Sequence, residues 1–176
     1  MELPIEWYSY VIPGVVCLVA IGLTRGNRAK EYFDKMDLST KFLFGLLLLI
    51  FSYPIGVGLD AGVNIIHYPF SGPPTPPYDK EFLLYQFASP ALVKAVTGGY
   101  IYVLFLRSMS AAVAILFIVL LFNLRRIELT GWRKIALPVI LFLVSCLFFI
   151  QYERQMSSYA KFQDTVYKNL ENHLTK

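Results

Sequence analysis

Four long apolar stretches dominate the chain, at residues 5–23, 42–67, 100–124 and 135–152. An α-helix rises about 1.5 Å per residue, so roughly 20 apolar residues cross the ~30 Å hydrocarbon layer of a bilayer. These stretches show almost no polar stripe of the kind that a helix in a water-soluble protein carries. The pattern therefore predicts an all-α membrane protein whose core is a bundle of four transmembrane helices.

The longest polar connection, residues 68–99, begins with a proline-rich run that favours extended backbone. A short helix is expected from Asp79, as its cap, to Phe87, followed by a second helix that Ser89 caps and that Gly98-Gly99 end. A segment of this length suggests more than a connection. It either lies on the membrane as an interfacial hairpin or covers a cavity or docks a partner.

The C-terminal tail, residues 153–176, contains no proline or glycine, and none separates it from most of the fourth apolar stretch. We therefore expect one continuous helix, divided into a transmembrane domain at residues 1–152 and an amphipathic helical tail. The contact face of the tail is predicted to contain Met156, Tyr159, Phe162, Val166 and Leu170. Because a lone amphipathic helix is unstable in water, this face must pack on the loop, on other copies of the chain or on another protein.

Composition and charge support a membrane protein with a defined orientation. Charged residues make up 16% of the chain, against about 25% in a typical soluble domain. Nine of the sixteen basic residues lie at 24–41 and 125–134, which by the positive-inside rule face the cytoplasm of a bacterial inner membrane. Both termini are then extracytoplasmic. The formal charge of +4 indicates anionic lipid head groups rather than nucleic acid as the counter-charge.

Two opposite charges interrupt the apolar stretches at matching depths. Asp60 lies about two turns before the outer end of the second stretch, and Arg107 lies about two turns after the outer start of the third. Charge inside a span is costly and is usually paired or functional. The pair is expected to lock the two helices together, within one subunit or between neighbours. Alternatively, these residues line a pore or cavity, or sit at the head-group boundary and extend their polar ends to water.

Small residues in the second and third stretches predict close helix packing. Gly58 and Gly62 form a GxxxG motif, and Ser52 and Gly56 form a second pair with the same spacing. The predicted packing residues are Ser52, Gly56, Gly58, Gly62, Ser108 and Ala112. Pro13 and Pro54 predict kinks in the first and second helices.

No catalytic motif is present in the sequence. It contains no GxSxG, HExxH or Walker loop and no paired intramembrane carboxylates. Cys17 and Cys146 lie in apolar runs without a CxxC motif, and there are only two histidines, so the cysteines are expected to pack rather than bind metal. The chain is therefore predicted to be a non-enzymatic protein without a metal or cofactor.

Two short segments carry a resemblance to known proteins. Tyr10-Val-Ile-Pro-Gly and Ser52-Tyr-Pro-Ile-Gly resemble motifs of small bacterial four-span proteins. Some of these belong to phage-defence loci, including the membrane subunit of the Kiwa system and membrane accessories of RNA-targeting CRISPR loci. The resemblance implies an inner-membrane protein that works with a protein partner, and it transfers no functional residue.

The resulting hypothesis is a membrane protein that forms homo-oligomers and acts with a protein partner as a sensor, scaffold or pore-forming subunit, with antiviral defence as its setting. The alternatives are a small accessory subunit that stabilises a larger membrane complex and a membrane immunity protein that blocks a toxin.

Overall fold

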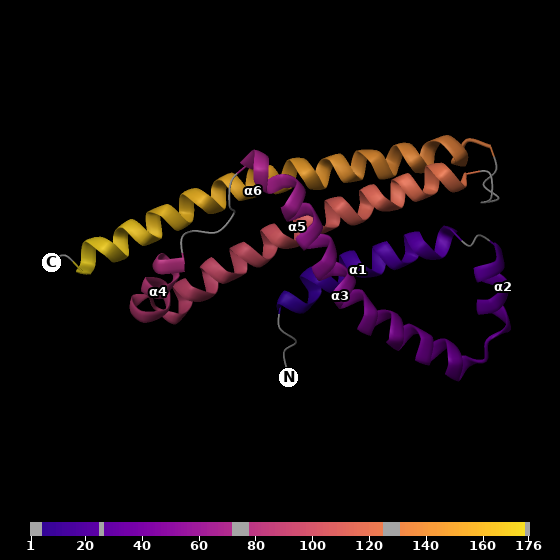
Figure 1. Cartoon of the computed structure of the whole chain (residues 1–176), viewed down its shortest axis with the longest axis horizontal. Helices are drawn as coiled ribbons and strands as arrows, with labels where there is room; N and C mark the ends of the chain where they lie inside the picture. The colour runs from indigo at the N-terminus through magenta and orange to yellow at the C-terminus, as the bar shows by residue number, and fades with distance from the viewer. Residues whose placement is uncertain (1–4, 25–26, 72–77, 125–130, 175–176) are drawn as a thin grey trace.

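The computed structural model describes residues 5–24, 27–71, 78–124 and 131–174, and all regular secondary structure in these ranges is helical. The helices are α1 (Ile5–Thr24), α2 (Asn27–Lys35), α3 (Leu38–Ser71), α4 (Tyr78–Phe87), α5 (Pro90–Asn123) and α6 (Arg133–Leu174) (Figure 1). Among the described residues, α3, α5 and α6 each contain a segment long and apolar enough to cross a membrane, and α1 contains a shorter apolar segment, Trp7–Gly22. The all-α class is thus confirmed.

Helix α1 lies between α3 and α5, and α5 in turn lies between α1 and α6. Helices α5 and α6 form a long antiparallel hairpin that runs the whole length of the molecule, while α3 crosses α1 and contacts α5 near the middle (Figure 1). Much of the surface of α3 and α6 is apolar and exposed, including Phe42, Ile50, Phe142 and Leu147. A lipid environment is the solvent in which such surfaces are stable.

Helix α2 is an element that the sequence pattern did not predict. Its nine residues are mostly charged, and they connect the end of α1 to the start of α3. Asp37 ends the connection by capping α3, because its carboxylate accepts hydrogen bonds from the backbone N–H groups of Ser39 at 3.2 Å and Thr40 at 3.4 Å. The hydroxyl of Thr40 also donates to this carboxylate and lowers the pKa of Asp37 below its usual value. An aspartate placed just before an apolar run is the signal that could have located this boundary.

The end expected at Gly98-Gly99 is wrong, because α5 continues through both glycines to Asn123. The predicted start is confirmed: Ser89 has extended backbone angles, its side chain accepts from the N–H of Leu92, and Pro90 occupies the first turn. Gly99 is needed for space rather than for a turn. A Cβ atom at Gly99 would lie 3.0 Å from the Tyr159 ring, so the glycine lets α6 approach α5 closely.

Helix α6 is continuous over 42 residues, from Arg133 to Leu174, and it includes Pro138. The lack of proline and glycine after Pro138 predicts its continuity from Val139 onward. At about 1.5 Å per residue it is roughly 63 Å long, about twice the thickness of the hydrocarbon layer. Its residues 153–174 pack on α4 and on the first turns of α5. We call this assembly of α4, residues 90–99 and residues 153–174 the distal unit.

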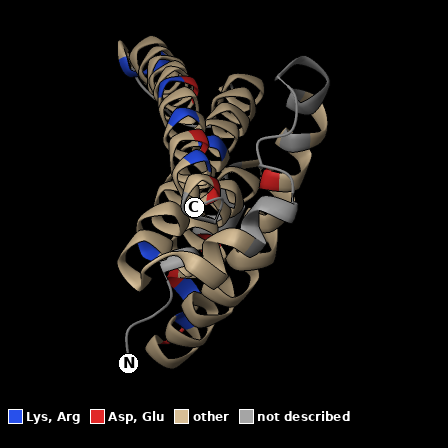
Figure 2. Cartoon of the chain, turned by 90° about the vertical axis from the view of Figure 1, so that its left-hand side faces the viewer, with Lys and Arg blue, Asp and Glu red and all other residues tan. Residues whose placement is uncertain are grey.

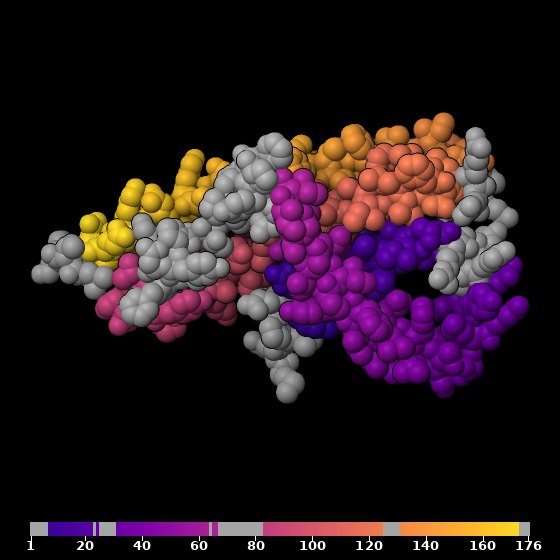
Figure 3. All heavy atoms as spheres, in the orientation of Figure 1, coloured from indigo at the N-terminus to yellow at the C-terminus, as the bar shows by residue number. Residues whose placement is uncertain are grey.

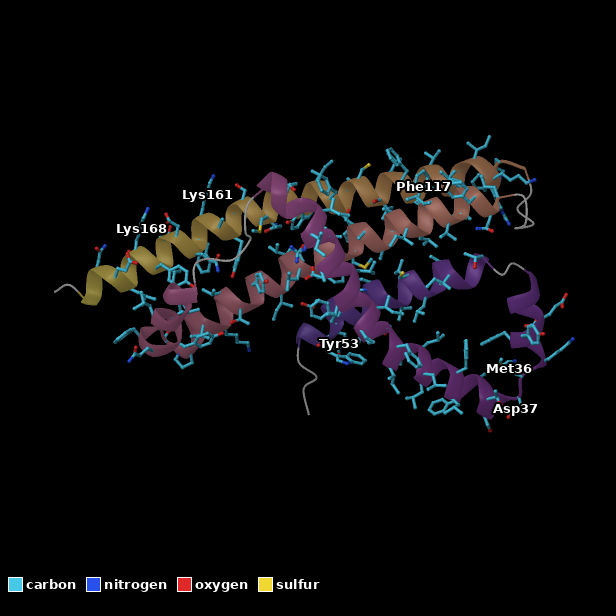
Figure 4. All side chains as sticks on the ribbon, viewed as in Figure 1. Met36, Asp37, Tyr53, Phe117, Lys161 and Lys168 are labelled. Atoms are coloured by element: carbon cyan, nitrogen blue, oxygen red, sulfur yellow. The ribbon has the colours of Figure 1, made fainter. Side chains whose placement is uncertain are left out.

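The distal unit has its own apolar core, so the tail packs on the loop rather than standing alone. Leu84 of α4, Val96 of α5 and Val166 and Leu170 of α6 are all buried in one cluster. The charged residues of α6 lie on the opposite side, where Lys161 and Lys168 point away from α5 (Figure 4). Figure 2 shows these charges gathered along the part of α6 that leads to the C-terminus.

The predicted contact face of the tail is correct for Tyr159, Val166 and Leu170, which are buried, while Met156 packs against the same cluster. It is wrong for Phe162, whose side chain is 40% exposed. The buried position next to it belongs to Gln163, a polar residue that the apolar spacing does not include. Its side-chain amide donates a 2.6 Å hydrogen bond to the Tyr159 hydroxyl, which satisfies this polar group inside the apolar core.

These exposures predict a contrast between two neighbouring positions of α6. Val166→Ala removes buried methyl groups from the core of the distal unit and should lower the free energy of unfolding by about 2 kcal/mol. Phe162→Ala removes a larger but exposed side chain and should change it by less than about 0.5 kcal/mol. Unfolding of the detergent-solubilised protein measures both. A larger loss for Phe162→Ala than for Val166→Ala would contradict this placement of α6.

Candidate functional site: an ion pair between α3 and α5

Asp60 of α3 and Arg107 of α5 are in direct contact. The Nη2 and Nε atoms of Arg107 lie 2.7 Å and 2.8 Å from Oδ1 of Asp60, and Nε donates a hydrogen bond to it. The hydroxyl of Ser108 donates a weaker bond of 3.4 Å to the same oxygen. The structure therefore brings together within one chain the two charges that the sequence places at equal depth.

The ion pair combines a buried arginine with a largely buried aspartate. Arg107 is 4% exposed and Asp60 is 15% exposed. The guanidinium of Arg107 also donates a hydrogen bond to the hydroxyl of Tyr152, a buried residue of α6. Tyr10 of α1 interacts electrostatically with both Asp60 and Arg107. The site, which we call the polar centre, thus contains Tyr10 of α1, Asp60 of α3, Arg107 and Ser108 of α5, and Tyr152 of α6.

The geometry of the polar centre suits a contact that holds α3 and α5 together. Burying two charges costs several kcal/mol each, which is repaid only by close contact and additional hydrogen bonds. Arg107 has both, because it binds Asp60 through two nitrogens and also reaches Tyr152. A charge that lined a wide aqueous pore would be expected to be more exposed than 4%. The geometry therefore favours the locking interpretation over the pore lining and over extension to the head-group boundary.

Next to the polar centre, α1 and α3 approach each other until their backbones touch. A Cβ atom at Gly14 would lie 1.8 Å from the carbonyl oxygen of Ser52, and a Cβ atom at Gly56 would lie 1.9 Å from the carbonyl oxygen of Tyr10. Ser52 is fully buried, and its hydroxyl donates to the carbonyl of Leu49. The four residues form a reciprocal contact, in which each helix places one glycine against the backbone of the other. We call it the α1–α3 crossing.

Of the predicted small-residue pairs, only Ser52 and Gly56 make such a contact. At Gly58 and Gly62 an added Cβ atom would meet no atom of the described residues within 4 Å, so the GxxxG motif makes no close contact in the part of the chain that the structure describes. The two motifs lie on different faces of α3, and only the face of Ser52 and Gly56 meets α1. The sequence shows the spacing of small residues but not which face of the helix has a neighbour.

The predicted packing residues of α5 are buried. Ser108 and Ala112 have no exposed surface. Two residues after Ser108, a pair of hydrogen bonds joins α5 to α6. The Ser145 hydroxyl donates to the carbonyl of Ser110 at 3.2 Å, and the Ser110 hydroxyl donates back to the carbonyl of Ser145 at 3.4 Å. Ser145 was not singled out from the sequence, although a lone serine in an apolar stretch is a recognisable signal for such a bond.

Both helices continue through their prolines. Pro13 is fully buried within α1, while Pro54 is exposed on α3. The predicted kinks at these residues stay predictions. The side chains of His67 and Asp79 lie outside the described residues, and so does the proline-rich segment 72–77.

Among the described residues, no cluster of three or more His, Cys, Asp or Glu side chains could hold a metal ion. Searches against protein-family models, curated proteins and solved structures found no match for this chain. The resemblance to phage-defence proteins therefore stays a prediction. Its two segments are the ones that form the α1–α3 crossing, so helix packing alone accounts for their residues.

Proposed function

We propose that this chain is a non-enzymatic scaffold or sensor of the bacterial inner membrane that presents its distal unit to a protein partner. The observation that carries the proposal is the continuity of α5 and α6 between their apolar segments and the distal unit. One apolar cluster extends from Val103 and Leu106 through Tyr152 to Leu170. A load or a contact at the distal unit would therefore be transmitted to the polar centre.

In this proposal all four long helices cross the bilayer. The 20 residues of α1 span about 30 Å, which matches the hydrocarbon layer, and its position between α3 and α5 supports a transmembrane place. The basic residues of the segments 24–41 and 125–134 would face the cytoplasm. The distal unit and both termini would then be extracytoplasmic.

The distal unit also offers a surface for a partner. Tyr85 and Phe87 of α4 are 67% and 48% exposed, although they lie next to the buried Leu84. Large aromatic side chains in this position are typical of protein-binding surfaces. A setting in phage defence rests on the resemblance alone.

Native mass spectrometry of the complex extracted from membranes tests this function. We expect a mass that exceeds a whole multiple of the 20.1 kDa chain, because a partner remains bound. Tyr85→Ser/Phe87→Ser should remove the excess, while Phe162→Ser, on an exposed face of α6, should retain it. Liposomes that contain the purified chain alone should show no ion flux. Flux from the chain alone would favour the pore-forming subunit, and a silent monomer without a partner would refute both readings.

A further inference from the structure

Helices α1 and α3 touch at their crossing and separate toward α2. Residues seven positions apart lie on the same face of a helix. On α3, Ser52 is fully buried in the crossing, whereas a Cβ atom at Gly45, seven residues earlier, would meet no atom within 4 Å. On α1, Gly14 is in backbone contact, whereas Ile21, seven residues later, is 52% exposed. The two facing surfaces are thus in contact at one end and open at the other.

The open space between them, which we call the fork, is visible in the space-filling view as an opening between α1 and the first half of α3 (Figure 3). Its walls are apolar. Leu18 and Ile21 lie on the side of α1, and Phe44 and Leu48 lie on the side of α3. Within the hydrocarbon layer of a bilayer, an apolar space that is open to the lipid is filled by acyl chains rather than by water.

The mouth of the fork carries a basic group, the ammonium of Lys41. Lys41 lies on the same face of α3 as Gly45 and Ser52, eleven residues before Ser52, and this places it at the open end. Its ammonium lies 5.4 Å from the centre of the Phe33 ring of α2, and this ring also packs edge-on against Phe44. Lys41 is therefore held where α2 covers the fork. In the sequence, the segments 24–41 and 125–134 together contain nine basic and four acidic residues.

We propose that the fork binds an anionic phospholipid, with its acyl chains between α1 and α3 and its phosphate beside Lys41. The charge at the mouth and the apolar walls match the two parts of this ligand, and α2 with its exposed Tyr32 would lie at head-group level. The inference is independent of the distal unit and of any protein partner. A second copy of the chain and bulk lipid without selectivity are the competing occupants.

Quenching of tryptophan fluorescence by brominated lipids tests the proposal. The reporter protein carries Trp7→Phe, Trp132→Phe and Leu48→Trp, so that its one tryptophan stands in the fork. In liposomes, dibrominated phosphatidylglycerol should be preferred over dibrominated phosphatidylcholine by about five-fold, the order of preference that one basic residue near the head group provides. A matched reporter with Ile140→Trp, on the exposed face of α6, should show no preference.

Two further variants separate the competing occupants. Lys41→Gln should abolish the preference at Leu48→Trp, whereas Lys134→Gln, which removes a charge at the same end but away from the fork, should leave it. Equal quenching by both lipids would refute a specific site, and absence of quenching would indicate that protein fills the fork. If Leu48→Trp does not fold, native mass spectrometry of the unaltered chain replaces the quenching experiment. The unaltered chain should retain bound phosphatidylglycerol, and the Lys41→Gln variant should lose it. Equal retention by the two proteins would overturn the proposal.

Discussion

Arg107→Gln is expected to lower the free energy of unfolding by about 3–5 kcal/mol, because it leaves the Asp60 carboxylate buried between α3 and α5 without its counter-charge. Asp60→Asn should lower the free energy of unfolding by a similar amount. Arg107 would then stay buried without its counter-charge, although it would keep its hydrogen bond to Tyr152. The double variant Asp60→Asn/Arg107→Gln should be more stable than either single variant, because two neutral amides leave no unpaired charge. Titration with denaturing detergent, followed by circular dichroism, measures all three.

A second ion pair in the same chain provides the control. Lys168 and Asp164 of α6 are also 2.7 Å apart, but their side chains are 66% and 57% exposed. Solvent screens such a pair, so Asp164→Asn/Lys168→Gln and both of its single variants should each change stability by less than about 1 kcal/mol. If the double variant at the polar centre is as unstable as Arg107→Gln, then Asp60 and Arg107 do not act as a pair. The locking interpretation would then fail.

The polar centre could be predicted from the sequence because charge is rare in apolar stretches. Asp60 and Arg107 stand out against their neighbours, and counting turns from the ends of two antiparallel helices places them at one level. Tyr10 and Tyr152 could not be assigned to the same site, because tyrosines are common near membrane interfaces and their position around the helix depends on the neighbours.

The same limit explains where the structure differs from the sequence pattern. Gly58 and Gly62 have the spacing of a packing motif, but the face of α3 that meets α1 is set by the tertiary arrangement. Gly98 and Gly99 would end an isolated helix, but packing against α6 keeps α5 continuous and gives Gly99 a role in close approach. The apolar spacing predicts Phe162 on the contact face of the tail, yet the buried position is that of its neighbour Gln163. In each case local preference was overridden by contacts between distant segments.

The α1–α3 crossing links the polar centre to the fork. The helices are in backbone contact at Gly14 and Gly56, and from there they diverge toward α2. On the other side of the crossing, Asp60 lies one turn from Gly56 and reaches Arg107. The crossing therefore sets both the alignment of the ion pair and the opening of the fork. A change in the angle or distance between α1 and α3 at this crossing would therefore alter both the ion pair and the fork.

Gly56→Ala is the second substitution from which we expect a large effect. The added methyl group would lie 1.9 Å from the carbonyl oxygen of Tyr10, and because this atom belongs to the backbone of α1, no change of side-chain rotamer can relieve the overlap. The helices must move apart, which should cost more than about 3 kcal/mol, at the upper end of the range for overpacking. The matched control is Gly58→Ala, two residues along the same helix, where the methyl group meets no atom within 4 Å. There, the higher helix propensity of alanine predicts a slight gain in stability, up to about 1 kcal/mol. Thermal unfolding of both variants in the same detergent measures this difference in stability. Equal stability would show that the helices do not touch at Gly56. A loss of stability confined to Gly58→Ala would place the contact on the opposite face of α3.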